Sequence, residues 1–226
     1  MFNVVLMIAS LVLCFSLEII VYKFFKKEGL YVWIAVASIL ANILICKQVD
    51  IINNPICLGS ILFGSNFLAT DILTIKYNKK VATKGIILGL IAVLGYIITT
   101  QIGLAFKPSD IDISQSSMYN LFTISARVSI ASVSMYFISN LIDIHIFDKL
   151  IKKSNKIWLS NNLATIISNV GENFLFGFLA FAGVFSFKEL LLMQIAGSIL
   201  EIIIALCDTP FLYIAKKIGA NNESRV

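Results

Sequence analysis

Residues 140–181 read NLIDIHIFDKLIKKSNKIWLSNNLATIISNVGENFLFGFLAF, a stretch in which long apolar runs carry isolated polar residues. It contains Asp143, the only histidine of the chain (His145) and a series of Asn, Thr and Glu side chains. Unpaired polar groups are costly in hydrocarbon, so such residues are retained where they pair with one another or with a ligand. The stretch therefore predicts two membrane helices with polar inner faces, joined by a lysine-rich loop.

The whole chain has the composition of a membrane protein. Of its 226 residues, 58% are hydrophobic and 14% are charged, and the mean hydropathy is +0.91. An ordinary soluble domain has about a quarter of its residues charged. We therefore expect an all-α integral membrane protein with a single transmembrane helical domain over residues 1–226, made of a core at 56–215 and additional N-terminal helices within 3–46.

Seven apolar segments are long enough to cross a hydrocarbon core of about 30 Å. They cover residues 3–22, 29–46, 56–75, 85–106, 118–147, 159–184 and 189–215. Several lysines or arginines follow the first, third, fifth and seventh segments, whereas the other loops hold only Lys47, Lys107 and Lys188. Because short cytoplasmic loops are enriched in Lys and Arg, we expect the N-terminus outside and the C-terminus in the cytoplasm.

Several other function classes are disfavoured. The net charge of +5 comes from lysines in short loops and not from a basic face with interleaved aromatics, so no nucleic-acid partner is expected. The cysteines stand singly in apolar segments, which predicts small buried side chains and no metal site. The chain has no nucleotide-hydrolysis motif and no familiar catalytic motif, so we expect neither an enzyme nor a cofactor, and the energy for any transport must come from an ion gradient or a partner.

Polar side chains gather on one face of four segments, because residues about 100° apart on a helix return to the same side every three or four positions. In 118–147 this face holds Ser125, Ser129, Ser132, Tyr136, Ser139, Asn140 and Asp143. In 159–184 it holds Asn162, Thr165, Asn169, Glu172, Asn173 and Phe176. The third segment presents Asn66, Thr70, Asp71 and Thr74, and the seventh presents Gln194, Ser198, Glu201 and Asp208. We expect these faces to meet inside the bundle.

Two interpretations of the polar faces stay open. Ser, Thr, Asn and Gln hydrogen-bond across membrane helices for about 0.6 kcal/mol each, so the isolated serines fit a structural role. A charge at mid-bilayer costs at least about 2.5 kcal/mol, so the carboxylates and Arg127 indicate a ligand site or a pathway. Arg127 either forms a structural ion pair with Asp71 or Glu172 or contacts the ligand directly. Glu18 either pairs helices or lies near the aqueous side.

Four motifs resemble the queuosine precursor transporter family, also called the vitamin uptake transporter family. They are FLATDILT (67–74), YNLFTISARVSIAS (119–132), LIDIHIFDKLI (141–151) and IWLSNNLATIISNVGENFLFGFLAF (157–181), and the likeness covers about residues 56–210 in order. The resemblance implies a compact bundle of six core transmembrane helices, to which this chain adds an N-terminal helix to give seven spans. It also implies a multi-pass protein of the bacterial inner membrane that imports 7-deazaguanine bases (queuine, preQ1 or preQ0) for queuosine in transfer RNA.

The substrate that the resemblance implies fits the polar faces. The ring N–H and exocyclic amine of a 7-deazaguanine are two adjacent donors, which one carboxylate, Asp71 or Glu172, can accept together. Flat rings stack on aromatic side chains, and a cationic side-chain amine requires a second carboxylate, Asp143 or Glu201. The candidate substrate-binding residues are Asn66, Phe67, Thr70, Asp71, Arg127, Tyr136, Asn140, Asp143, Asn162, Thr165, Asn169, Glu172, Phe176 and Glu201.

Three mechanisms remain to be distinguished. The favoured one is an importer that works by alternating access, with a site between the third, fifth, sixth and seventh segments and a coupling ion or proton left open. The second is a substrate-capture subunit that works with a separate ATPase module for a vitamin or nucleobase. The third, ranked last, is a membrane enzyme with Asp143 and His145 as an acid–base pair, because residues two apart face different ways on a helix. Monomer and homodimer both stay open.

Overall fold

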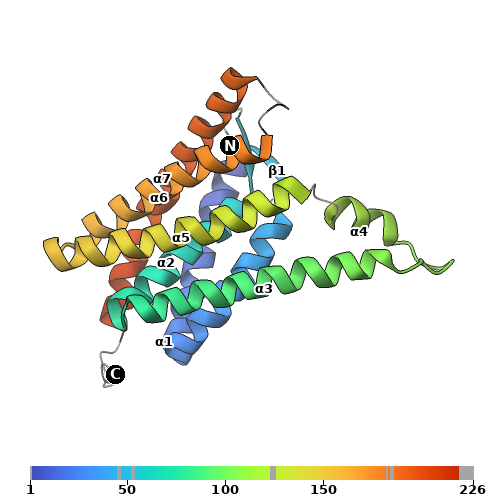
Figure 1. Ribbon diagram of the computed structural model, residues 1–226. Helices are drawn as coiled ribbons and strands as arrows, with labels where there is room; N and C mark the ends of the chain where they lie inside the picture. Colours follow the sequence, from blue (N-terminus) through green and yellow to red (C-terminus); the bar gives the residue numbers. More distant parts are fainter. Residues whose placement is uncertain are drawn as a thin grey trace.

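The computed structural model describes residues 2–44, 47–51, 54–122, 126–181, 183 and 186–218. Over these ranges the chain forms a bundle of helices with one short β-hairpin (Figure 1). The helices are α1 (Phe2–Leu44), α2 (Gly59–Lys76), α3 (Lys79–Ala105), α4 (Gln115–Phe122), α5 (Ala126–Ser154), α6 (Ile157–Phe181) and α7 (Phe187–Lys217). Strands β1 (Gln48–Ile51) and β2 (Asn54–Cys57) pair antiparallel, with Val49 opposite Ile56.

Helix α1 consists of two arms that meet at a kink at Lys26, whose backbone has φ 54° and ψ −135°. A Cβ atom added at Gly29 would lie 2.8 Å from the carbonyl oxygen of Val21. Eight residues of straight helix span about 12 Å, so this close approach requires a sharp turn between them. The arms correspond to the predicted segments 3–22 and 29–46.

Three helices in the described ranges are long and apolar enough to cross a membrane: Phe2–Leu44, Lys79–Ala105 and Leu190–Lys217. Helix α3 also shows a lipid-facing surface, because Ile87, Ile91, Leu94, Ile98 and Ile102 are exposed at intervals of three and four residues. These features are those of a helical membrane protein. The count of seven spans stays a prediction.

The predicted segment 118–147 corresponds to two helices, α4 and α5, and residues 123–125 between them, with Ser125, lie outside the described part. Helix α5 continues to Ser154, seven residues beyond the end of the predicted apolar segment. Hydrophobicity marks only the part of a helix that lies in the apolar region, and the polar residues from Asp148 onward continue the same helix outside it. The short β-hairpin was not predicted. Its residues lie where the apolar segments 29–46 and 56–75 were expected to be joined by a plain loop.

The lysine-rich connections gather at one end of the bundle. Lys76, the last residue of α2, donates hydrogen bonds to the carbonyl oxygens of Lys216 (2.6 Å) and Ile218 (3.1 Å) after α7. Lys27 at the α1 kink lies over the ring of Tyr77. In Figure 1 the α2–α3 turn, the α5–α6 turn and the last turns of α7 lie toward the left, whereas the start of α1, β1 and α4 lie toward the top and right. The lysine-rich loops therefore lie at one end of the bundle, and the loops with few lysines lie at the other.

The core forms where α1 packs against α2, α3 and α7, and where α6 packs against α5 and α7. Phe15, Leu68, Ile72, Ile86 and Phe147, from four different helices, have no exposed surface. Helix α2 is buried along almost its whole length and so lies at the centre of the bundle. Residues on α2 are therefore positioned to face several helices at once.

Candidate functional site

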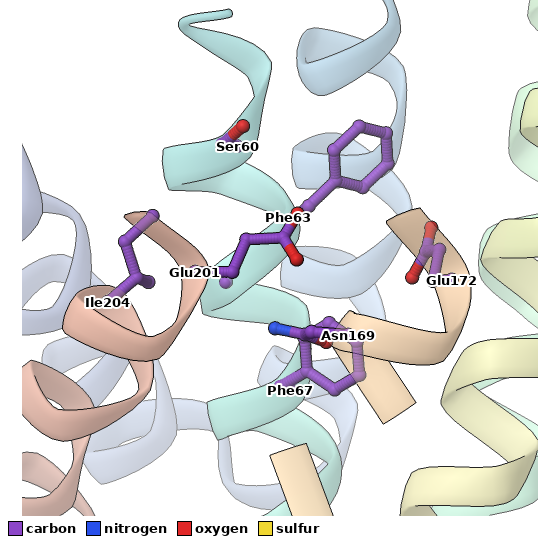
Figure 2. A pocket seen from close by; sticks show the side chains of 8 residues that line it. Ser60, Phe63, Phe67, Asn169, Glu172, Glu201 and Ile204 are labelled. Atoms are coloured by element: carbon purple, nitrogen blue, oxygen red, sulfur yellow. The ribbon is translucent and has the colours of Figure 1, made fainter. Parts of the chain in front are cut away.

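A small cavity lies between α2, α6 and α7. Its lining residues are Ser60, Phe63, Gly64, Phe67, Asn169, Glu172, Glu201 and Ile204 (Figure 2). The cavity volume is about 20 Å³, which is room for about one water molecule. Four of the candidate residues predicted from the sequence line it: Phe67, Asn169, Glu172 and Glu201. The polar faces predicted for the third, sixth and seventh segments therefore meet at this cavity.

Helical spacing brings these side chains together. The four lining residues of α2 are separated by three, one and three positions, which is one helix face. Asn169 and Glu172 on α6, and Glu201 and Ile204 on α7, are each three positions apart. A Cβ atom added at Gly64 would collide with Cγ2 of Ile204. The absence of a side chain at Gly64 therefore lets α2 and α7 come into direct contact.

Two carboxylates and one amide supply the polar chemistry of the cavity. Figure 2 shows Glu201 and Glu172 on opposite sides, with Asn169 and Phe67 between their helices. Asn173 donates a hydrogen bond of 2.5 Å from Nδ2 to Oε2 of Glu201. The Oδ1 atom of Asn169 is buried and has no hydrogen-bond partner in the described ranges. The cavity can thus accept several hydrogen bonds from a flat ligand held against an aromatic side chain.

A buried hydrogen-bond network lies beside the cavity and joins α1, α2 and α5. Ser38 Oγ lies 2.6 Å from the carbonyl oxygen of Ile34, 2.8 Å from Tyr136 Oη and 3.0 Å from Asn66 Nδ2. A hydroxyl has one hydrogen and two lone pairs, so Ser38 donates to Ile34 and accepts from Tyr136 and Asn66. The ring of Tyr136 lies 6.0 Å from that of Phe63, centroid to centroid. The predicted residues Asn66 and Tyr136 thus support the cavity wall without lining the cavity.

Four carboxyl groups form a second buried set, here called the acidic cluster: Glu18, Asp71, Asp143 and Asp208. Each is at most 1% exposed. Asp71 has the other three as electrostatic neighbours. Asp71 and Asp143 were predicted to contact substrate, but the structure places both outside the cavity lining, with the predicted Thr165 beside Asp143. In the ranges described, no three His, Cys, Asp or Glu residues are placed to hold a metal ion.

The other predicted residues lie around these two sets. Thr70 donates to the Phe67 carbonyl (2.9 Å), and Asn140 donates to the Tyr136 carbonyl (2.8 Å), so both hydrogen-bond within their own helices. Asn162 donates to Thr209 Oγ1 at 2.9 Å, near the acidic cluster and away from the cavity lining. Phe176 on α6 is half-buried and outside the cavity lining.

The side chain of Arg127 lies outside the described part of the structure, so its ion pair or ligand contact stays a prediction. Its backbone belongs to α5, sixteen residues before Asp143, which is about 24 Å along the axis. Asp143 is fully buried, whereas His145 is exposed and its Nδ1 lies 2.9 Å from the carbonyl oxygen of Leu141. The two residues face opposite sides of α5, so they do not form an acid–base pair.

Sequence reasoning did not assign three groups of residues to the site. Ser60, Phe63 and Gly64 precede Phe67 at helical spacing, and that spacing was the signal that could have identified them. Ser38 gave only the weak signal of one serine in an apolar segment. Glu18 was expected either to pair helices or to lie near the aqueous side, and the structure buries it beside Asp71 of α2. Its isolation as the one carboxylate of the segment 3–22 was the signal for buried partners.

Comparisons with known proteins agree with this arrangement of polar faces. Residues 57–215 match the sequence profile of a family described as "Putative vitamin uptake transporter". The chain belongs to this family. The family consists of transporters, so the chain is a membrane transporter and not an enzyme, and the resemblance seen in the four motifs is confirmed.

Two relatives carry more specific names. The chain is 30% identical over 226 residues to the "Probable queuosine precursor transporter" of Bacillus subtilis (strain 168), covering 99% of both chains. It is 29% identical over 143 residues to the "Queuosine precursor transporter" of Escherichia coli (strain K12), covering 62% of both chains. No solved structure matches the chain.

Proposed function

We propose that this chain imports 7-deazaguanine bases (queuine, preQ1 or preQ0) across the bacterial inner membrane and so supports queuosine modification of transfer RNA. Two relatives named as queuosine precursor transporters, one of which the chain covers almost completely, support this substrate class. The observation that carries the proposal is the cavity between α2, α6 and α7, where two carboxylates face each other across an amide and two phenylalanines.

The cavity chemistry fits the donor pattern of the base. The ring N–H and the exocyclic amine next to it can both donate to one carboxylate, and we assign this contact to Glu172. Asn169 offers an amide to the remaining polar edge, and Phe63 and Phe67 offer faces on which the ring can stack. Glu201 is then available to the cationic side-chain amine of queuine or preQ1, a group that preQ0 lacks. We therefore expect the amine-bearing bases to be preferred.

The size of the cavity supports alternating access. A volume of about 20 Å³ is far too small for a bicyclic base, so α2, α6 and α7 must separate for the base to enter. We propose that the described conformation is a closed state, with seven spans in the membrane, the N-terminus outside and the lysine-rich end in the cytoplasm. Opening toward the hairpin end admits the base, and opening toward the lysine-rich end releases it.

Uptake in cells that cannot synthesise queuosine precursors tests the proposal. Expression of this chain should restore queuosine in transfer RNA when queuine or preQ1 is supplied at low concentration. Glu172→Gln keeps the size of the side chain but removes the charge, and the loss of one charge-assisted pair, about 1.5–3 kcal/mol, should weaken transport roughly ten- to hundredfold. Asp148→Asn, at an exposed ion pair with Lys152, is the matched control. No restoration of queuosine by the wild-type chain would refute the proposal.

Uptake by the purified chain alone distinguishes the importer from the capture subunit. Vesicles that contain only this protein should take up labelled queuine without ATP. A requirement for a separate ATPase in cells and in vesicles would favour the capture-subunit mechanism instead.

A further inference from the structure

The acidic cluster lies one helical turn from the cavity, toward the lysine-rich end of the bundle. On α2, Asp71 follows the cavity residue Phe67 by four positions, and on α7, Asp208 follows Ile204 by four positions. Four residues of α-helix rise about 6 Å. Both helices run toward the end where Lys76 bonds to the carbonyl of Lys216. A path from the cavity to that end therefore passes the acidic cluster.

The acidic cluster is short of hydrogen-bond donors. Asn161 Nδ2 donates to Asp208 Oδ1 at 2.6 Å, and Ser168 Oγ is 3.1 Å from Asp143 Oδ1. The other six carboxyl oxygens of the cluster are buried and have no partner in the described ranges. The hydroxyl of Thr165, which is 1% exposed, lies beside Asp143. The shortage is independent evidence that this site accommodates something besides the side chains present.

Cations from the described side chains do not make up the shortage. The ion pairs found in the described ranges, Lys27 with Glu28 and Lys152 with Asp148, involve no member of the cluster. Removing an unpaired carboxylate from water costs several kcal/mol, and four neighbouring negative charges would cost more. A proton on one carboxyl both removes a charge and creates the O–H donor that a neighbouring carboxyl lacks.

We propose that the acidic cluster is a proton-binding site that couples ligand movement through the cavity to proton entry. A carboxyl oxygen forms an O–H bond with a proton from outer water, and that bond breaks when the proton passes to water at the lysine-rich end, with no electron transferred. This inference rests on the proposed transport function. It adds that protons drive the import of the base and that they bind at a site separate from the cavity. The surrounding helices carry few other titratable groups near the cluster. They are Cys14 and Tyr22 on α1, Lys76 at the end of α2, His145, Asp148 and Lys149 on α5 and Cys207 on α7, while α6 supplies neutral Asn161, Thr165 and Ser168. Helix α3 carries Lys79, Lys80 and Lys84 near its beginning and Tyr96 further along.

Reconstituted vesicles test the coupling. With the outside one pH unit more acidic, one proton per base should drive about tenfold accumulation of labelled queuine, because one unit corresponds to 1.36 kcal/mol. A protonophore should abolish the accumulation. Asp208→Asn and Glu18→Gln should also abolish it, while the exchange of labelled for unlabelled base across the membrane persists. Asp148→Asn and Glu28→Gln, at acidic residues outside the cluster, should behave as wild type.

Infrared spectroscopy tests proton binding without any substrate. The purified full chain at neutral pH should show the C=O band of protonated carboxyl groups, and Asp208→Asn and Glu18→Gln should each weaken it, with monodisperse elution as the check on folding. If wild type fails to take up base but shows this band, the proposed substrate is wrong and the proton site stands. Absence of the band, accumulation driven by sodium instead of protons, or full accumulation by both variants would overturn the proton site.

Discussion

Replacing Ser38 by alanine should destabilise the protein more than removing the hydroxyl of Tyr136, although both changes break the same hydrogen bond. Ser38→Ala leaves two buried donors without an acceptor, Tyr136 Oη and Asn66 Nδ2. Each unsatisfied buried donor costs about 1–3 kcal/mol, so the expected loss for the two donors is about 2–6 kcal/mol. Tyr136→Phe removes one donor together with its hydroxyl, and Ser38 keeps its bonds to Ile34 and Asn66. Its expected cost is about 0.5–1.5 kcal/mol.

Denaturation of the purified protein in mixed detergent micelles measures this difference. The variants should unfold in the order Ser38→Ala first, Tyr136→Phe second and wild type last. Ser134→Ala, at an exposed serine of α5, serves as the control and should lie within about 0.5 kcal/mol of wild type. An equal or larger loss for Tyr136→Phe would show that Ser38 is not the shared acceptor, and the packing of the second arm of α1 against α2 and α5 would have to be revised.

Three other changes address the helix contact, the kink and the outer loop. Gly64→Ala should lower uptake several-fold, because its Cβ would collide with an α7 side chain, whereas Gly95→Ala has open space around it and should leave uptake unchanged. Lys26→Gly should raise stability in a thermal melt by about 1 kcal/mol, since the positive φ there is strained for a residue with a side chain. The hydroxyl and backbone N–H of Ser114 hold the pKa of Asp112 below its ordinary value of 3.8. The bonds from Ser114 to the Asp112 carboxylate should therefore stabilise the loop at pH values above 3.8, and this stabilisation should be lost as the pH falls through the lowered pKa. Carbon NMR of the Asp112 carboxyl measures this pKa, which should be higher in Ser114→Ala than in wild type.

Helical periodicity explains why part of the site could be predicted from the sequence. Asn169, Glu172 and Glu201 are polar residues in apolar segments, and the bilayer makes such residues conspicuous. Their spacing placed them on inner faces, and the structure brings those faces together at the cavity. The family resemblance rests on the same residues, since rare intramembrane polar side chains at fixed spacing are what make its motifs specific.

The remaining features gave no such signal. Phe63 and Gly64 are residue types that any lipid-facing helix also contains, so their place in the cavity depends on how α2 is rotated against α7. Asp71 is separated from the cavity residue Phe67 by one helical turn, a shift that face analysis cannot resolve because both positions lie on the same face of α2. The kink at Lys26 depends on a left-handed backbone conformation at a residue type that does not favour it.

The close contact between Gly64 of α2 and Ile204 of α7 also bears on leakage. A protein that carries solutes down or against a gradient wastes that gradient whenever its interior is continuously hydrated. Here the cavity between α2, α6 and α7 holds room for about one water molecule, and α2 touches α7 beside it. We expect this contact to limit the passage of water and ions at the level of the cavity while the protein is empty, so that ion gradients are kept between one transport cycle and the next.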